Sequence, residues 1–290
     1  MQAAEPSSTA KRTAARRGEH RLSDQRPWVL DDPFALMLVG PEWREILTAP
    51  ASLLSEPVSR EGRAGLVGRA RYAEDRLLDG RFDQYVILGA GLDSFAWRRP
   101  DLLRSLRVFE VDHPATQAWK QERMSVLALP AHDRHIFAPV DFENETLRDG
   151  LNAAGLDWSQ PTIFSWLGVT AYLTIGAIEA TLRTVASCAA GSEIVLTYCP
   201  TDEFIDDLGR EFRRTMGPVA AKAGEPYRTL LTPPEASALV EGCGLKVVNH
   251  PTRDDLHSRY FADRTDGLTP ATHERLIAAS VLRDSNQVWA

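Results

Sequence analysis

The stretch YVILGAGLDSFAWR, residues 85–98, decides the fold of this chain. Its first four residues form a continuous apolar run, which is typical of a strand buried on both faces of a parallel sheet. The run ends in Gly89-Ala90-Gly91, and a helix-like segment follows. Glycine at such a turn lets the backbone approach a ligand closely. The stretch therefore predicts a strand, a binding loop and a helix in that order, although a tight structural turn would leave the same pattern.

Short apolar runs recur along the rest of the chain, and helix-like segments separate most of them. They lie at residues 107–111, 136–140, 162–166, 194–198 and 245–248, and a last patch at 275–282 fits a closing strand or, almost as well, a helix. Strands that alternate with helices form parallel sheets with helices on both faces. The sequence thus predicts an α/β fold with a mostly parallel, doubly wound sheet of seven strands.

The regions outside this alternation have a helical pattern. A short surface helix fits residues 8–20, short helices joined by turns fit 27–54, and a longer helix fits 59–78. Residues 201–226 insert a charged helix and a loop after the run 194–198, where insertions often cover ligands. We expect one domain over residues 1–290, with an N-terminal helical layer (1–80), a binding core (81–200), an inserted helical cover (201–232) and the C-terminal part of the sheet (233–290).

The loop after the first strand departs from a dinucleotide-binding fingerprint. Where the third glycine would stand, the chain has Ser94, and Asp93 precedes it. A carboxylate at that place disfavours a bound pyrophosphate, whereas a cofactor with an ammonium group and no phosphate tolerates it. The residues therefore argue against a diphosphate cofactor.

Acidic residues follow the next two predicted strands. Asp112 stands 23 residues after Gly89, and an acid at the end of the second strand of such folds accepts hydrogen bonds from ribose hydroxyls. Asp112 could equally cap the helix that starts near Pro114. Asp141 and Phe142 end the following strand and could offer an adenine an acceptor and an apolar wall, although Asp141 also suits a helix cap.

Composition excludes several classes of partner. The net charge of −7 argues against nucleic-acid binding, which needs clustered positive charge. Three scattered cysteines, no apolar run of membrane-spanning length and no secretory signal lead us to expect a cytoplasmic protein. His132 and His135 lie three residues apart without a third ligand, so we expect no metal.

At this point the motifs, taken together, resemble the leucine carboxyl methyltransferase family, and its bacterial small-molecule branch in particular. The resemblance spans nearly the whole chain, beginning with an S-x-TA-like start at residues 8–10 and DDPFA at residue 31. It is carried further, in order, by LGAGLDSFAWR, FEVDHP, DFENE, GEPYRTLLTPPEASALVEGCGL and RYFADRTDGL. It implies a Rossmann-like class I methyltransferase that uses S-adenosyl-L-methionine.

The resemblance also implies roles for single residues. It makes the glycine loop of residues 89–91 a cofactor contact, Asp112 the ribose ligand, and Asp141 and Phe142 the adenine contacts. In such enzymes an arginine before the first strand holds the cofactor carboxylate. Arg69 matches that position, with Arg71 as the alternative.

Two further contacts depend on the same resemblance. A basic residue of the N-terminal segment also reaches the cofactor carboxylate in eukaryotic members, and Lys11 is its counterpart here. Where the family usually has a glutamate, this chain has Leu167. The resemblance then leaves the methionine ammonium to a main-chain carbonyl near Ser165, or to Asp93.

The expected reaction is methyl transfer to an oxygen of a small molecule, a carboxylate or a hydroxyl. No residue stands out as a general base, which favours an acceptor that is already ionised. A nicotinamide-dependent oxidoreductase and a non-catalytic protein that binds an adenosyl ligand are the alternatives. The sequence does not indicate the oligomeric state.

Overall fold

A single mixed sheet forms the centre of the computed structural model, which describes residues 7–49, 54–141 and 145–282. The strand order in the described residues is β3-β2-β1-β4-β5-β7-β6, and only β7 runs antiparallel to its neighbours. The seven predicted strands all form, and the last patch is a strand rather than a helix. The strands are β1 (Gln84–Leu88), β2 (Arg107–Asp112), β3 (His135–Pro139), β4 (Thr162–Trp166), β5 (Glu193–Tyr198), β6 (Leu245–Asn249) and β7 (Arg275–Val281).

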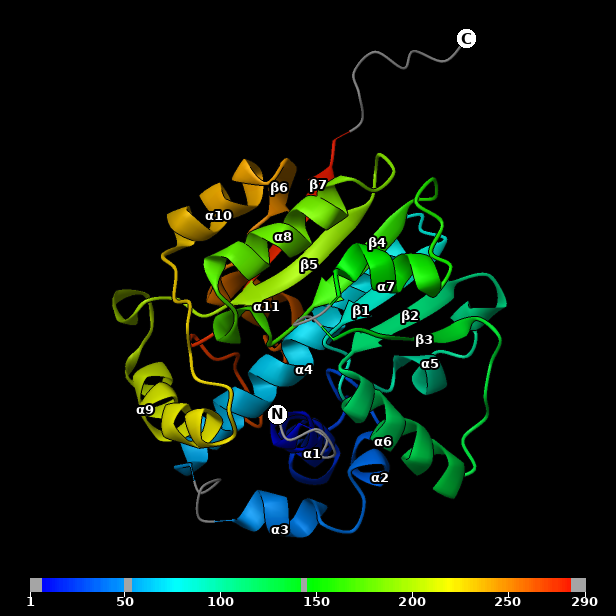
Figure 1. Ribbon diagram of the computed structural model, residues 1–290. Coiled ribbons are helices and arrows are strands. Elements are labelled where there is room, and N and C mark those ends of the chain that lie inside the picture. The colour runs from blue at the N-terminus through cyan, green and yellow to red at the C-terminus, as the bar shows by residue number, and fades with distance from the viewer. Residues whose placement is uncertain (1–6, 50–53, 142–144, 283–290) are drawn as a thin grey trace.

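Helices cover both faces of this sheet (Figure 1). Side chains alternate along a strand, so Val86 and Leu88 of β1 pack on one face, whereas Tyr85 and Ile87 pack on the other. The first face carries α7 (Leu147–Ala153), α8 (Ile175–Ala186) and α10 (Pro233–Gly242). The second carries α4 (Glu56–Asp79), α5 (Phe95–Arg98) and α11 (Arg253–Tyr260). The doubly wound arrangement predicted from the sequence is confirmed.

The N-terminal helices form a layer beside the glycine loop. Helix α1 (Ser8–Ser23) packs on α2 (Ala35–Val39), α3 (Trp43–Thr48) and α4. Two helices thus extend beyond their predicted ranges of 8–20 and 59–78. Figure 1 shows α9 (Asp207–Lys222) beside α4, away from the sheet. The remaining helices are α6 (Pro114–Val126) and the 3-10 turns η2 (Leu102–Arg104), η3 (Thr170–Tyr172) and η4 (Asp202–Phe204).

A buried carboxylate joins this N-terminal layer to the binding loop. Asp32 accepts hydrogen bonds from Arg17 Nε at 2.6 Å and from the Ser94 hydroxyl at 2.7 Å. Arg17 also donates to the carbonyl oxygen of Leu92 at 2.6 Å. Burial alone would raise the pKa of Asp32, but the charges of Arg17 and Arg98 hold it below its usual value. The position of α1 over the loop is therefore fixed by charged hydrogen bonds.

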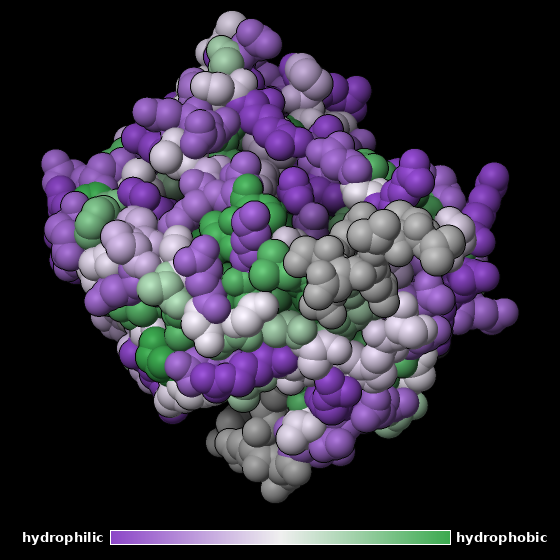
Figure 2. Space-filling model, turned by 90° about the horizontal axis from the view of Figure 1, so that it is seen from above, coloured by the Kyte–Doolittle hydropathy of each residue, from purple (hydrophilic) through white to green (hydrophobic). Residues whose placement is uncertain are grey.

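One face of the molecule has a hydrophobic centre. Figure 2 shows a face on which hydrophobic residues gather near the centre, with hydrophilic residues around them. Within residues 7–49, 54–141 and 145–282, no helix is long and apolar enough to cross a membrane.

Candidate active site

The loop after β1 requires glycine at two positions. Gly89 has a φ of +66° and Gly91 a φ of +49°, a region that side chains disfavour. A Cβ atom at Gly89 would lie 2.6 Å from Val169 Cγ2, and one at Gly91 would lie 3.0 Å from Ala10 Cβ. The main-chain amide of Ala90 donates to the Val111 carbonyl at 3.0 Å. The loop is thus held against β2, with α1 on one side and the segment after β4 on the other.

Asp112 ends β2 directly beside this loop. Its carboxylate accepts hydrogen bonds from the main-chain amides of Gly91 at 2.6 Å and His113 at 2.7 Å. Burial raises the pKa of Asp112 despite these two bonds. The cap of α6 is His113, whose ring accepts from the amide of Ala115, so Asp112 does not cap that helix. A carboxylate at the sheet edge, in contact with the glycine loop, is well placed for a ribose.

The other two acidic positions lie near the same edge. Asp93 accepts a hydrogen bond from the amide of Phe95 at 2.7 Å, at the start of α5. Asp141 follows the last residue of β3 by two positions, and its amide donates to Glu145 Oε2 at 3.2 Å. Phe142, the expected adenine wall, lies outside the described residues.

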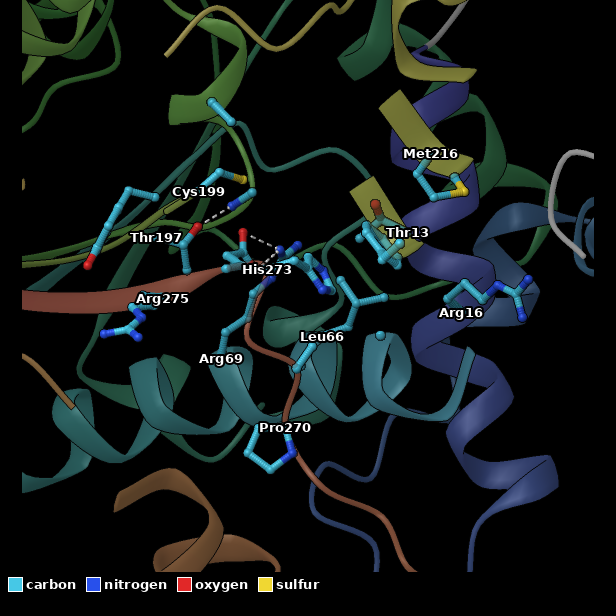
Figure 3. A pocket seen from close by; sticks show the side chains of 18 of the residues that line it. Thr13, Arg16, Leu66, Arg69, Thr197, Cys199, Met216, Pro270, His273 and Arg275 are labelled. Atoms are coloured by element: carbon cyan, nitrogen blue, oxygen red, sulfur yellow. Dashed lines mark hydrogen bonds and ion pairs between the residues drawn. The ribbon is translucent and has the colours of Figure 1, made fainter. Parts of the chain in front are cut away.

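A cavity lies at the carboxyl ends of β4 and β5, next to the glycine loop (Figure 3). Helices α1, α4 and α9 form its other walls, and the residues that precede β7 close it. In Figure 3, Thr13 of α1 and Met216 of α9 lie close together on one side, with Thr197, Cys199 and Arg275 on the other. Because parallel strands end together here, this is where open α/β sheets bind ligands.

Arg69 reaches this cavity from α4. Its Nη1 atom donates to both oxygens of Glu274, at 2.8 and 2.6 Å. Its Nη2 atom has no hydrogen-bond partner within the described part of the chain, and it lies 2.7 Å from where a Cβ of Gly168 would stand. Arg69 therefore keeps one edge of its guanidinium available at the end of β4.

Among the predicted cofactor residues that the structure describes, Arg69 lines the cavity and the others do not. Lys11 Nζ pairs with Glu42 at 3.1 Å and lies 4.4 Å from the centroid of the Trp119 ring. Arg71, the alternative to Arg69, is exposed and bonds Asp75 at 2.7 Å. Ser165 lies inside β4, where its hydroxyl accepts from Tyr85 at 2.9 Å. A contact from any of these residues to the methionine part of a cofactor would need the local structure to change.

The cavity also contains groups that the sequence did not single out. Arg12 projects from α1 and has no hydrogen-bond or ion-pair partner among the described residues. Burial lowers the pKa of Arg12, although Tyr172 and Glu225 partly offset this. His273 stacks on Phe212 with ring centroids 3.7 Å apart, and burial lowers the pKa of His273 to about 4. The cavity thus combines a half-buried guanidinium that has no hydrogen bond to a described residue with aromatic groups that are neutral at pH 7.

The stacked position of His273 gives a prediction about stability. At pH 7 the imidazole is neutral in the folded and the unfolded chain, so it contributes no pH dependence there. Below the unfolded pKa of about 6.5 the unfolded chain gains a proton that the folded chain takes up only near pH 4. The free energy of unfolding should therefore fall between these values, by roughly 2 kcal/mol more than in His273→Phe, which keeps the stack without titrating. Urea unfolding at pH 7 and 4.5 measures this, and equal losses in both proteins would show that His273 is protonated in the fold.

Comparison with known proteins adds independent evidence. A sequence model of the leucine carboxyl methyltransferase family matches residues 10–186. "Putative S-adenosyl-L-methionine-dependent methyltransferase YktD" of Bacillus subtilis is 37% identical over 210 residues, 70% of this chain and 68% of that protein. A Mycobacterium bovis protein named for the same activity is 30% identical over 221 residues, 72% of either chain. A crystal structure described as a putative methyltransferase from Thermobifida fusca has a TM-score of 0.61 at 16% identity, and covers 97% of each chain.

The fold, the glycine loop and these relatives define the class. The chain is an S-adenosyl-L-methionine-dependent methyltransferase, and S-adenosyl-L-methionine is its cofactor. It belongs to the leucine carboxyl methyltransferase family, as the motifs quoted above indicate. The nicotinamide-dependent oxidoreductase alternative is wrong.

Proposed function

We propose that this enzyme methylates an oxygen of a small molecule, and that this oxygen belongs to a carboxylate. The observation that carries the proposal is the Arg12 guanidinium, a half-buried cation that faces the cavity with no hydrogen bond or ion pair to a described residue, although the charge of Glu225 acts on it from nearby. Removing a cation from water is unfavourable unless an anion compensates it. A carboxylate on the acceptor would supply that compensation.

The proposed cofactor site lies beside the cavity, at the glycine loop, which Val169 of the cavity wall contacts. The space beside Gly89 and Gly91 admits only glycine, and the Asp112 carboxylate lies against it for the ribose hydroxyls. We propose that Arg69 Nη2 holds the methionine carboxylate near Gly168. Ala90, Asp93, Asp141 and Phe142 complete the proposed cofactor site, with Lys11 and Ser165 as its most distant members.

The bound cofactor supplies a methyl group on a sulfonium sulfur, and a lone pair of the acceptor oxygen forms the new O–CH₃ bond as the S–CH₃ bond breaks. The part of the cavity wall that the structure describes offers little basic assistance. Burial raises the pKa of Cys199 to about 12 and raises the pKa of Tyr172 and Tyr227 as well. The pKa of His273 is lowered to about 4, so its imidazole is a weak base. A carboxylate needs no proton removed, and alignment with the methyl group then lowers the barrier.

The pH dependence of the methyl-transfer step tests this proposal. With a carboxylic acid as acceptor, the single-turnover rate should stay nearly flat from about pH 6 to 8.5, because a carboxylate with a pKa near 4 is fully ionised throughout. Rapid-quench measurement of the methylated product gives the rate directly. A tenfold rise per pH unit would show that a hydroxyl must lose its proton, and would contradict the carboxylate proposal.

A further inference from the structure

Four of the aromatic rings that line the cavity are arranged as two stacked pairs. Tyr172 and Tyr227 stack with centroids 5.6 Å apart and an interplanar angle of 19°. Phe212 and His273 stack at 3.7 Å and 10°. All four side chains are half-buried and line the cavity. They come from the segment after β4, from α9, from the loop after α9 and from the residue two positions before β7. Segments far apart in sequence therefore bring flat, apolar surfaces to one place.

The inner face of α9 extends this surface. Phe212, Met216 and Ala220 recur at four-residue intervals, so they lie on one side of the helix, and all three line the cavity. Helix α4 packs against α9 here, because a Cβ atom at Gly62 would lie 3.2 Å from the Phe212 ring. Rings and a thioether favour flat, polarizable ligands over saturated ones, because aromatic stacking adds to the burial of apolar area.

The rings are neutral over the physiological pH range. Burial raises the pKa of Tyr172 and Tyr227 and lowers the pKa of His273 to about 4. They offer apolar faces and hydrogen-bond donors, not charge. The anionic end of a ligand is instead attracted by Arg12, which lines the same cavity as these rings.

We propose that the acceptor is an aromatic carboxylic acid, with its ring packed against these four aromatic side chains and its carboxylate directed by Arg12. This inference rests on the proposed carboxylate chemistry and adds to it the class of molecule that bears the carboxylate. Phe212, Met216 and Tyr227 would then contact the acceptor and determine specificity, and the glycine loop would bind the cofactor.

Two matched pairs of probes separate the ring from the charge. Benzoate and cyclohexanecarboxylate carry the same carboxylate on a flat and a puckered ring, and phenol and cyclohexanol repeat the comparison without the charge. Each is titrated into the protein saturated with S-adenosylhomocysteine and followed by NMR. Benzoate should bind at least fivefold more tightly than cyclohexanecarboxylate. Equal affinity for these two acids would overturn the proposal.

Variants then assign the effect to residues. Phe212→Leu should reduce the preference for benzoate to within twofold, whereas Phe204→Leu, which removes a ring of the same segment outside the cavity, should leave it unchanged. Arg12→Gln should weaken both acids tenfold or more with unchanged affinity for S-adenosylhomocysteine, and Arg21→Gln on the same helix should not. An unchanged preference in Phe212→Leu would overturn the aromatic assignment.

The same probes and variants, together with an assay for the methylated product, distinguish the proposed carboxylate chemistry from the proposed aromatic surface. Loss of S-adenosylhomocysteine affinity in Arg12→Gln would show that Arg12 holds the cofactor carboxylate, and would overturn its role toward the acceptor. Tight binding of phenol over cyclohexanol, with methylation of phenol but of neither acid, would refute the proposed carboxylate chemistry and leave the aromatic surface supported.

Discussion

Replacing Asp112 with Ala should weaken the binding of S-adenosyl-L-methionine by roughly 1–3 kcal/mol, about 5- to 150-fold in dissociation constant. The change removes the acceptor for the ribose hydroxyls and also frees the amides of Gly91 and His113, which bond that carboxylate at 2.6 and 2.7 Å. Both losses weaken binding. The ribose loses its acceptor, and the glycine loop is no longer held in the shape that admits the cofactor. Isothermal titration calorimetry measures the change.

The control for this prediction is a carboxylate near the same part of the chain. Asp101 is exposed and pairs with Arg99 at 2.8 Å, so Asp101→Ala should bind the cofactor like the parent protein. A melting temperature for Asp112→Ala close to that of the parent would show that the loop, and not the whole fold, is affected. Cofactor binding as tight as in the parent would remove Asp112 from the ribose site.

A second large effect is expected at Arg69. Arg69→Gln should weaken cofactor binding by about 1.5–3 kcal/mol, the range for a hydrogen bond to a charged group. Arg71→Gln should change it by less than about 0.5 kcal/mol, because Arg71 is exposed and bonds only Asp75 and the Val29 carbonyl among the described residues. Calorimetry on both variants gives the comparison.

The ion pair with Glu274 separates a direct contact from a structural one. In Glu274→Gln the Arg69 guanidinium loses its charged partner at 2.6 Å but keeps its own charge. If Arg69 grips the cofactor carboxylate, this variant should bind the cofactor at least as well as the parent protein. An equal loss of affinity in Arg69→Gln and Glu274→Gln would mean that the pair only supports the end of β4.

The positions of the strands and of the turn after β1 could be predicted because their signals are local. The run Tyr85-Val86-Ile87-Leu88 is apolar at every position, and the sheet buries all of it. The last strand was ambiguous because a continuous apolar run fits a buried helix as well as a buried strand. Its residues Leu276 to Ala279 are buried on both sides, and such a run has no period that separates strand from helix.

The cavity could be predicted only in part because its walls meet across long sequence distances. Arg69 pairs with Glu274, 205 residues away, and nothing in the segment before β7 marks Glu274 or His273 as functional. At the N-terminus, Lys11 and Arg12 are adjacent, and successive residues of a helix point about 100° apart. Lys11 faces Glu42 and Trp119 whereas Arg12 faces the cavity, a difference set by the packing of α1 rather than by the motif.

Helix α9 lies beyond the part of the chain that the family model matches. The model matches residues 10–186, which include the glycine loop, Asp112 and Arg69, whereas Phe212 and Met216 of α9 come later. The proposed roles therefore place donor binding and acceptor choice in different stretches of the chain. We expect substitutions on the inner face of α9 to change which acceptor is used and to leave the affinity for the donor unchanged.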